Sequence, residues 1–254
     1  MKLHDYQQVQ RLIIRALAKG AERTSTGIVK WDISGNCSNS FEQKFIGRPP
    51  ANSGRDFTWK SGQTHTLELL LYTRCRKCEN CLRKRATLWR ERAKAMIALS
   101  ERTWFGTLTL GPERQFKITC AAADRAQQKA ITFSELSEHE QFKLRTNEIS
   151  LEVTRWLKRV RKRSGARIKY CLVYEKHKSG DPHLHVLVHQ LSAQPPVLHS
   201  QLSNTWTYGF TNFKLVTDDQ AARYVSKYLS KSISSRVRAS KSYGKIPDFF
   251  ASRS

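Results

Sequence analysis

Two histidines separated by one residue form the pattern in this sequence that is best suited to metal chemistry. His183 and His185 alternate with Leu184, Val186 and Val188. Alternate side chains of a β-strand share a face, so we expect both imidazoles on one face and the apolar side chains in a core. Imidazole binds divalent transition metals, and sites that add a carboxylate also hold Mn²⁺ or Mg²⁺. The alternative is that the two histidines alternate in a strand without binding a metal.

The residues before this strand predict a hairpin and a third ligand. Residues 167–175 predict one strand, and 183–189 predict the return strand after a turn. If Glu175 pairs with His183, its carboxylate lies on the same face as the imidazoles. His189 points to this face further along the strand, and we expect it to be a partner or a surface residue, not a ligand.

Tyrosines and lysines downstream could supply a nucleophile and positive charge. Tyr224, Lys227, Tyr228 and Lys231 have helical spacing and predict one face of a helix. A tyrosine has an ordinary pKa of about 10, and a nearby lysine favours the phenolate and stabilises charge on a phosphoryl group. Beside a metal, such a pair could perform covalent phosphoryl transfer. The alternative is ordinary packing of an amphipathic surface helix.

Three cysteines precede another predicted helix. Cys75, Cys78 and Cys81 are spaced two residues apart in a chain without a predicted secretion signal, which indicates a metal site or reduced thiols. Structural Zn²⁺ takes four ligands, and the candidates for the fourth are Cys37 and His65. An iron–sulfur cluster is a further alternative, although the bacterial ferredoxin pattern needs one more cysteine.

The charge of the chain indicates a polyanionic partner. Lysine and arginine number 45 against 21 acidic residues, which gives 254 residues a formal net charge of +24. Such an excess favours nucleic acid first and an anionic membrane surface second. The basic run 155–163, at the end of a predicted helix, is dense enough for DNA contact to be expected. No apolar run approaches the roughly 20 residues of a membrane span.

Helices and strands that alternate along the chain position these groups. Periodicity predicts helices over 4–19, 82–97, 134–163, 197–208 and 217–231, and strands over 104–110, 167–175, 183–189 and 209–216. In the first strand, Thr107 and Thr109 share a face. Residues 20–64 predict loop with short strands at most, 113–133 a mixed connector, and residues beyond 231 a basic tail.

Three ordered motifs resemble those of HUH-type rolling-circle replication initiators. The motifs are Thr107-Leu108-Thr109-Leu110, His183-Leu184-His185 and residues 224–231. The doubled tyrosine–lysine pattern is most similar to the replication proteins of the microviruses, which are small single-stranded-DNA phages. The cysteine-rich segment 75–89 is similar to the stretch before the first motif in those proteins. The resemblance covers roughly residues 70–232.

The resemblance implies an α+β HUH nuclease fold, with a central antiparallel sheet of about five strands flanked by helices. We therefore expect a basic N-terminal region of unassigned function (1–66), an endonuclease domain (67–232) and a basic tail (233–254). The metal ligands would be His183, His185 and Glu175, which would hold Mg²⁺ or Mn²⁺. The nucleophile would be Tyr224 or Tyr228, with Lys227 beside it.

The expected activity is a site- and strand-specific single-stranded DNA endonuclease and ligase. It would nick an origin through a 5′-phosphotyrosine intermediate and so start rolling-circle replication. Expected partners are single-stranded DNA, origin duplex, and a host helicase and polymerase, because the sequence lacks a nucleotide-binding loop. The expected location is the cytoplasm of a bacterial host. Alternatives are a transposase or relaxase with the same chemistry, and a non-catalytic nucleic-acid-binding regulator with structural Zn²⁺.

Overall fold

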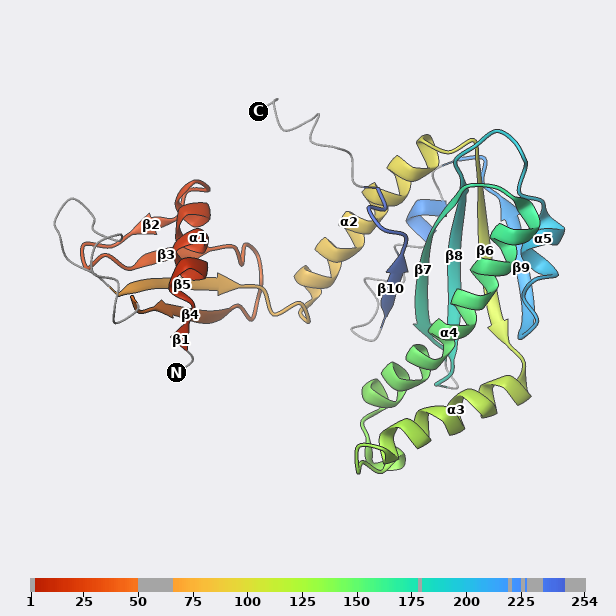
Figure 1. Cartoon of the computed structure of the whole chain (residues 1–254), viewed down its shortest axis with the longest axis horizontal. Helices are drawn as coiled ribbons and strands as arrows, with labels where there is room; N and C mark the ends of the chain where they lie inside the picture. The colour runs from red at the N-terminus through yellow and green to blue at the C-terminus, as the bar shows by residue number, and fades with distance from the viewer. Residues whose placement is uncertain are drawn as a thin grey trace. The chain divides into compact units, whose positions relative to one another are not determined.

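The chain forms two compact units, Met1–Cys81 and Leu82–Ser254, each with its own five-stranded sheet (Figure 1). The computed structural model describes residues 3–49, 66–177, 180–218, 221–224, 227 and 235–244. The boundary between the units lies at residue 81, whereas the sequence placed the start of the nuclease domain at residue 67. The difference arises because residues 67–73 form a strand of the first sheet.

The first unit is a mixed sheet covered by one helix. Its sheet has the order β1-β4-β5-β3-β2, formed by β1 (Leu3–His4), β2 (Glu22–Arg23), β3 (Val29–Asp32), β4 (Phe41–Gly47) and β5 (Leu67–Thr73). The helix α1 (Tyr6–Leu17) buries Val9, Ile13 and Ala16 in a cluster with Val29 and Leu69. The helix was predicted, whereas β4 lies in a region that predicted mainly loop, because its first four residues are exposed.

The second unit is built on an antiparallel sheet in the order β10-β7-β8-β6-β9. Its strands are β6 (Arg102–Leu110), β7 (Ile168–Lys176), β8 (Pro182–Gln190), β9 (Gly209–Leu215) and β10 (Arg236–Ala239). Every neighbouring pair is antiparallel. This arrangement, with its flanking helices, confirms the predicted α+β architecture. The strand β10 lies in the region expected to be a tail, so the sheet extends beyond residue 233.

One face of this sheet holds the main core beneath the long helix α4 (Glu138–Ser164). Leu184, Val186 and Val188 point to this face from β8 and are fully buried with Trp156 of α4. A capping box at Ser137 begins the helix, and Gly165 ends it with a φ of 63°. In Figure 1, α4 runs along the face of the sheet. The predicted helix over 134–163 is therefore present, although it begins four residues later.

The opposite face, which carries His183 and His185, is covered by α2 (Glu79–Ala98) and by the helical residues 221–224. Ala93 of α2 and Ala222 are buried in one cluster with sheet residues of β7 and β8. Because β9 and β10 lie at opposite edges of the sheet, the chain that joins them crosses this face and carries Tyr224.

The predicted connector 113–133 instead contains the helix α3 (Pro112–Gln127) and the 3₁₀ helix η1 (Phe133–Glu135). The prediction missed α3 because its buried stripe consists of Ile118 and two small alanines, which give a weak periodic signal. Gly111 and Pro112 begin this helix, and proline is well suited to a first helical position. The helix α5 (His199–Ser203) is shorter than the predicted 197–208.

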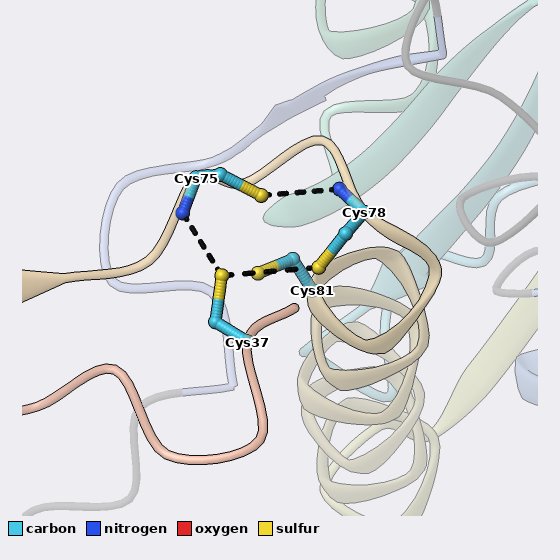
Figure 2. A group of neighbouring side chains, drawn as sticks. All are labelled: Cys37, Cys75, Cys78 and Cys81. Carbon is cyan, nitrogen blue, oxygen red and sulfur yellow. Dashed lines mark hydrogen bonds between the residues drawn. The ribbon is translucent and has the colours of Figure 1, made fainter. Parts of the chain in front are cut away.

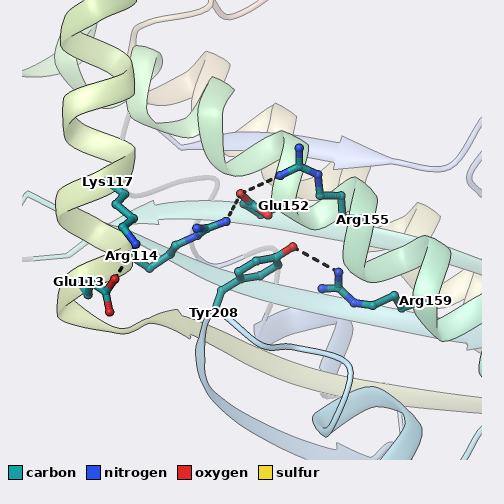
Figure 3. Close-up of polar contacts among 7 residues, drawn as sticks. All are labelled: Glu113, Arg114, Lys117, Glu152, Arg155, Arg159 and Tyr208. Atoms are coloured by element: carbon teal, nitrogen blue, oxygen red, sulfur yellow. Dashed lines mark hydrogen bonds and ion pairs between the residues drawn. The ribbon is translucent and has the colours of Figure 1, made fainter.

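Two arginines of the basic run at the end of α4 form internal contacts (Figure 3). Arg159 donates to the Tyr208 hydroxyl at 3.3 Å. Arg155 binds Glu152 at 3.2 Å, and Arg114 of α3 binds the same carboxylate. These arginines therefore hold neighbouring elements against α4, and only the remaining part of the run is available for the DNA contact that we predicted from its charge.

Candidate active site

The two histidines of the predicted motif lie side by side on β8, with a carboxylate from β7 beside them. Their ring centroids are 4.9 Å apart. The register of the hairpin places Glu175 directly opposite His183. The Glu175 carboxylate reaches the next rung, where its Oε2 lies 3.1 Å from Nε2 of His185. The structure therefore brings the three predicted ligands to one face of the sheet.

The donor set fits a hard or borderline cation. In octahedral coordination with ligands about 2.1 Å from the metal, adjacent ligand atoms lie about 3.0 Å apart, close to the 3.1 Å between Glu175 and His185. Among the described residues, however, the only group of at least three potential ligands with all its atoms within 4.8 Å is formed by cysteines elsewhere. Glu175 and His185 thus form a close pair, and His183 lies at its side.

Two threonines of β6 orient the histidine rings. Thr107 Oγ1 lies 3.4 Å from Nδ1 of His185, and Thr109 Oγ1 lies 3.3 Å from Nδ1 of His183. A hydrogen bond at Nδ1 leaves Nε2 as the ligating nitrogen, which is the usual way in which a neighbouring polar group orients a metal-binding histidine. The sequence placed both threonines on one face but did not predict their partners, because β6 and β8 are far apart in the chain.

The environment of His183 favours its ligating, neutral form. Burial lowers the pKa of His183 below its ordinary value of 6.5; the Glu175 charge acts in the opposite direction, and His177 lowers the pKa further. His177 follows β7, and its ring lies 6.3 Å from that of His183. The sequence analysis assigned His177 only to a turn, so it missed this third imidazole beside the pair.

Tyr224 lies against the histidine pair. Its ring centroid is 5.9 Å from that of His185 and 5.1 Å from that of Phe105, in both cases edge-on. Phe105 itself stacks almost parallel to His185 at 6.2 Å. Tyr224 is 45% exposed, so a substrate can reach it. Tyr228 and Lys231, the other predicted residues of this helix face, lie outside the described residues.

A basic groove lies beside Tyr224. It has a volume of about 540 Å³ and is lined by Arg83, Arg90 and Lys94 of α2 and by Arg223 and Lys227 of the tyrosine segment. The described residues that line it include no acidic side chain. A groove of this charge is suited to a phosphodiester backbone. Lys227 is therefore placed in this groove, three residues after Tyr224.

His189 is not a surface residue. It is fully buried, with Nδ1 at 2.9 Å from Thr103 Oγ1 and Nε2 at 2.8 Å from the Tyr243 hydroxyl. Burial lowers its pKa to about 3. Both ring nitrogens are therefore used in structural hydrogen bonds, which agrees with the prediction that His189 is a partner and not a ligand.

The comparison with protein families identifies the segment that carries these groups. A family model described as replication-associated protein ORF2 matches residues 103–233, just over half of the chain. The chain belongs to this family.

The part shared with the replication-associated family runs from β6 through the histidine strand to the tyrosine segment. It includes neither the first unit nor the cysteines. No curated protein and no solved structure matches the chain. Membership supports the predicted role in replication, whereas the HUH chemistry and the microviral subgroup stay proposals. No helix in the described part of this replication-associated protein has the length and apolar character needed to cross a bilayer.

Proposed function

We propose that this protein is a site- and strand-specific single-stranded DNA endonuclease and ligase that initiates rolling-circle replication. The observation that carries the proposal is the position of Tyr224, whose ring lies 5.9 Å from that of His185, while His185 pairs with Glu175 at 3.1 Å. A candidate nucleophile, two candidate metal ligands and a basic groove thus meet on one face of a rigid sheet. Family membership supports the setting of DNA replication.

The proposed reaction is a transesterification at a DNA phosphate. The phenol of Tyr224 or Tyr228 loses its proton, and its oxygen forms a bond to phosphorus as the bond to the 3′ oxygen breaks. The DNA keeps its 5′ phosphate as a tyrosine ester, and the released 3′ oxygen takes a proton to become a primer. Attack of a 3′ hydroxyl on the ester reverses the step and ligates the strand. Two tyrosines would allow one to hold a strand while the other attacks.

The charged groups have separate roles in this reaction. Lys227 favours the phenolate and stabilises negative charge on the phosphoryl group. Glu175, His183 and His185 would hold Mg²⁺ or Mn²⁺, which when bound polarises the scissile phosphate and stabilises developing charge. Thr107 and Thr109 keep the imidazoles oriented for that role.

Single-stranded DNA would follow the basic groove beside Tyr224, where phosphate contacts supply affinity without sequence preference. Origin duplex is the second proposed DNA partner. Unwinding and synthesis would then depend on a host helicase and polymerase, and the proposed site of action is the cytoplasm of a bacterial host. A cytoplasmic location is consistent with thiols in the reduced state.

The proposal is tested with full-length protein, Mn²⁺ and single-stranded oligonucleotides that tile the replicon encoding it. Intact mass spectrometry should show a covalent protein–DNA adduct, and peptide mapping should place it on Tyr224 or Tyr228. Tyr224→Phe and Tyr228→Phe together should reduce the adduct at least about 10³-fold, because the nucleophile is removed. Tyr208→Phe is the matched control, since that hydroxyl binds Arg159 on the other face of the sheet.

Two outcomes would contradict the proposal. An adduct that survives in the double variant would remove the assigned nucleophile. Binding of all oligonucleotides without cleavage at any divalent metal would instead favour a non-catalytic nucleic-acid-binding regulator. A transposase or relaxase would form the same adduct, but on a substrate that is not a replication origin.

A further inference from the structure

Four cysteines of the first unit converge at one point (Figure 2). Cys75, Cys78 and Cys81 lie between the end of β5 and the first turns of α2, and Cys37 comes from the connection between β3 and β4. All four sulfur atoms lie within 4.8 Å of one another. The sequence analysis left Cys37 and His65 as alternatives for a fourth ligand. His65 lies outside the described residues, and the structure places Cys37 in the cluster.

The spacing of the sulfurs matches a tetrahedral metal site. The Sγ atoms of Cys37 and Cys78 are 3.8 Å apart. A tetrahedral site with sulfur about 2.3 Å from Zn²⁺ separates its sulfurs by about 3.8 Å. A disulfide requires a separation of about 2.05 Å, and all four thiols are unpaired in the structure. The cluster therefore has the dimensions of a metal centre and not of a disulfide.

Backbone amides point at the sulfurs, as in a site built for thiolates. The amide of Cys75 donates to Sγ of Cys37 at 3.2 Å. The amides of Lys77 and Cys78 donate to Sγ of Cys75 at 3.4 and 3.2 Å. The turn that directs them has Arg76 in the left-handed region, with a φ of 61°. This conformation is uncommon for a residue other than glycine and is maintained only where the surrounding structure requires it.

The two segments that supply the sulfurs are also tied together by polar side chains. Asn80 donates to the carbonyl of Asn36 at 2.8 Å, and Arg74 donates to the carbonyl of Ile33 at 3.3 Å. The residues on either side of each cysteine are thus held in place. A metal at this point would join the β3–β4 connection to the start of α2.

We propose that Cys37, Cys75, Cys78 and Cys81 bind one Zn²⁺ as a structural tetrathiolate site. Thiolate ligands select Zn²⁺ over the hard cations Mg²⁺ and Mn²⁺. Four protein ligands fill a tetrahedral shell, so the ion has no open position for substrate and acts by holding the fold of the first unit. This proposal does not depend on the proposed function, because none of the four cysteines belongs to the sheet that carries the histidines.

The test is metal content of the full-length protein purified under reducing conditions. Inductively coupled plasma mass spectrometry should find one zinc per chain, and X-ray absorption at the zinc edge should find four sulfur neighbours at about 2.3 Å. Cys37→Ser should weaken zinc binding at least about 100-fold, whereas Cys37→His should retain the ion with three sulfurs and one nitrogen. Cys120→Ser is the matched control, because that thiol is exposed and outside the cluster.

The measurement on the unaltered protein keeps the proposal testable even if a variant does not fold. Protein that contains no zinc after reconstitution with excess Zn²⁺ would overturn it. Iron with the visible absorption of an iron–sulfur cluster would also overturn it. Full zinc retention in Cys37→Ser would remove Cys37 from the site.

Discussion

The two groups of candidate metal ligands in this protein are built in opposite ways. The histidine–carboxylate set comes from one hairpin, is oriented by the neighbouring strand β6, and lies under a tyrosine that is partly exposed. The cysteine set comes from two segments of the first unit and closes on itself, with all four sulfurs within 4.8 Å. An open arrangement of nitrogen and oxygen atoms suits a cation that contacts substrate, whereas a closed arrangement of sulfurs suits a structural ion.

The largest expected effect separates the two sites by function. His185→Ala should reduce cleavage of single-stranded DNA on the order of 10³-fold, because the cation that polarises the phosphate is lost. The zinc content of this variant should be unchanged. Cys78→Ser should give the reverse result, with zinc lost and cleavage of a short oligonucleotide maintained. Parallel measurement of adduct formation and metal content checks both, and a Cys78→Ser protein that folds but does not cleave would join the two sites.

A smaller effect is expected from the threonines that orient the histidines. Thr107→Val should lower the affinity for Mn²⁺ about 10–100-fold, measured as the Mn²⁺ concentration that gives half-maximal cleavage. Thr103→Val is the matched control, since its hydroxyl pairs with the buried His189 and not with a proposed ligand. The control should lose roughly 1–3 kcal/mol of stability without a change in Mn²⁺ dependence. Equal shifts in both variants would reduce the role of Thr107 to packing.

The buried His189 predicts a dependence of stability on pH. Burial lowers its pKa from 6.5 to about 3, so at pH 5 the unfolded chain binds a proton that the native protein does not. Stability should therefore fall as the pH drops below 6.5, by about 2 kcal/mol at pH 5 from this group alone. Urea titrations at pH 7 and pH 5 measure the loss. In His189→Gln the difference between the two pH values should shrink by that amount, and an unchanged difference would refute the assignment.

The smallest effect concerns the groove beside Tyr224. Arg90→Ala should weaken binding of single-stranded DNA and reduce the slope of log K against log salt by about 0.7, the value for one phosphate contact on a single strand. Lys129→Ala, at an exposed position outside the groove, should leave the slope unchanged. Fluorescence anisotropy over a range of salt concentrations measures both variants. Equal slopes would place the DNA elsewhere.

Local patterns predicted one of these sites more completely than the other. Alternation along 183–188 and a short hairpin determine which side chains share a face, so Glu175, His183 and His185 could be grouped from the sequence. Cys37 could only be proposed as one of two candidates, because its approach to Cys75 depends on the order of strands in the first sheet. Short-range periodicity contains no information about such a long-range contact.

The elements that were missed share weak apolar periodicity. The strand β10 presents Arg236 and Arg238 to the long helix, where Arg238 donates to Thr154 at 2.8 Å and Arg236 to Asn147 at 2.7 Å. Arginines that pack through hydrogen bonds resemble a solvated tail in sequence. The basic end of α4 led to the related error, since some of its charges bind internal partners instead of facing solvent.

The path of the tyrosine segment has a mechanical consequence. Its two ends belong to opposite edges of the sheet, through the seven-residue strand β9 and the four-residue strand β10. A DNA end esterified to Tyr224 would pull on a strap fastened at both sides, so tension from an advancing fork would be divided between two ladders of hydrogen bonds. The shorter ladder would peel first, and β10 is therefore the point at which load would release the captured strand from the histidines.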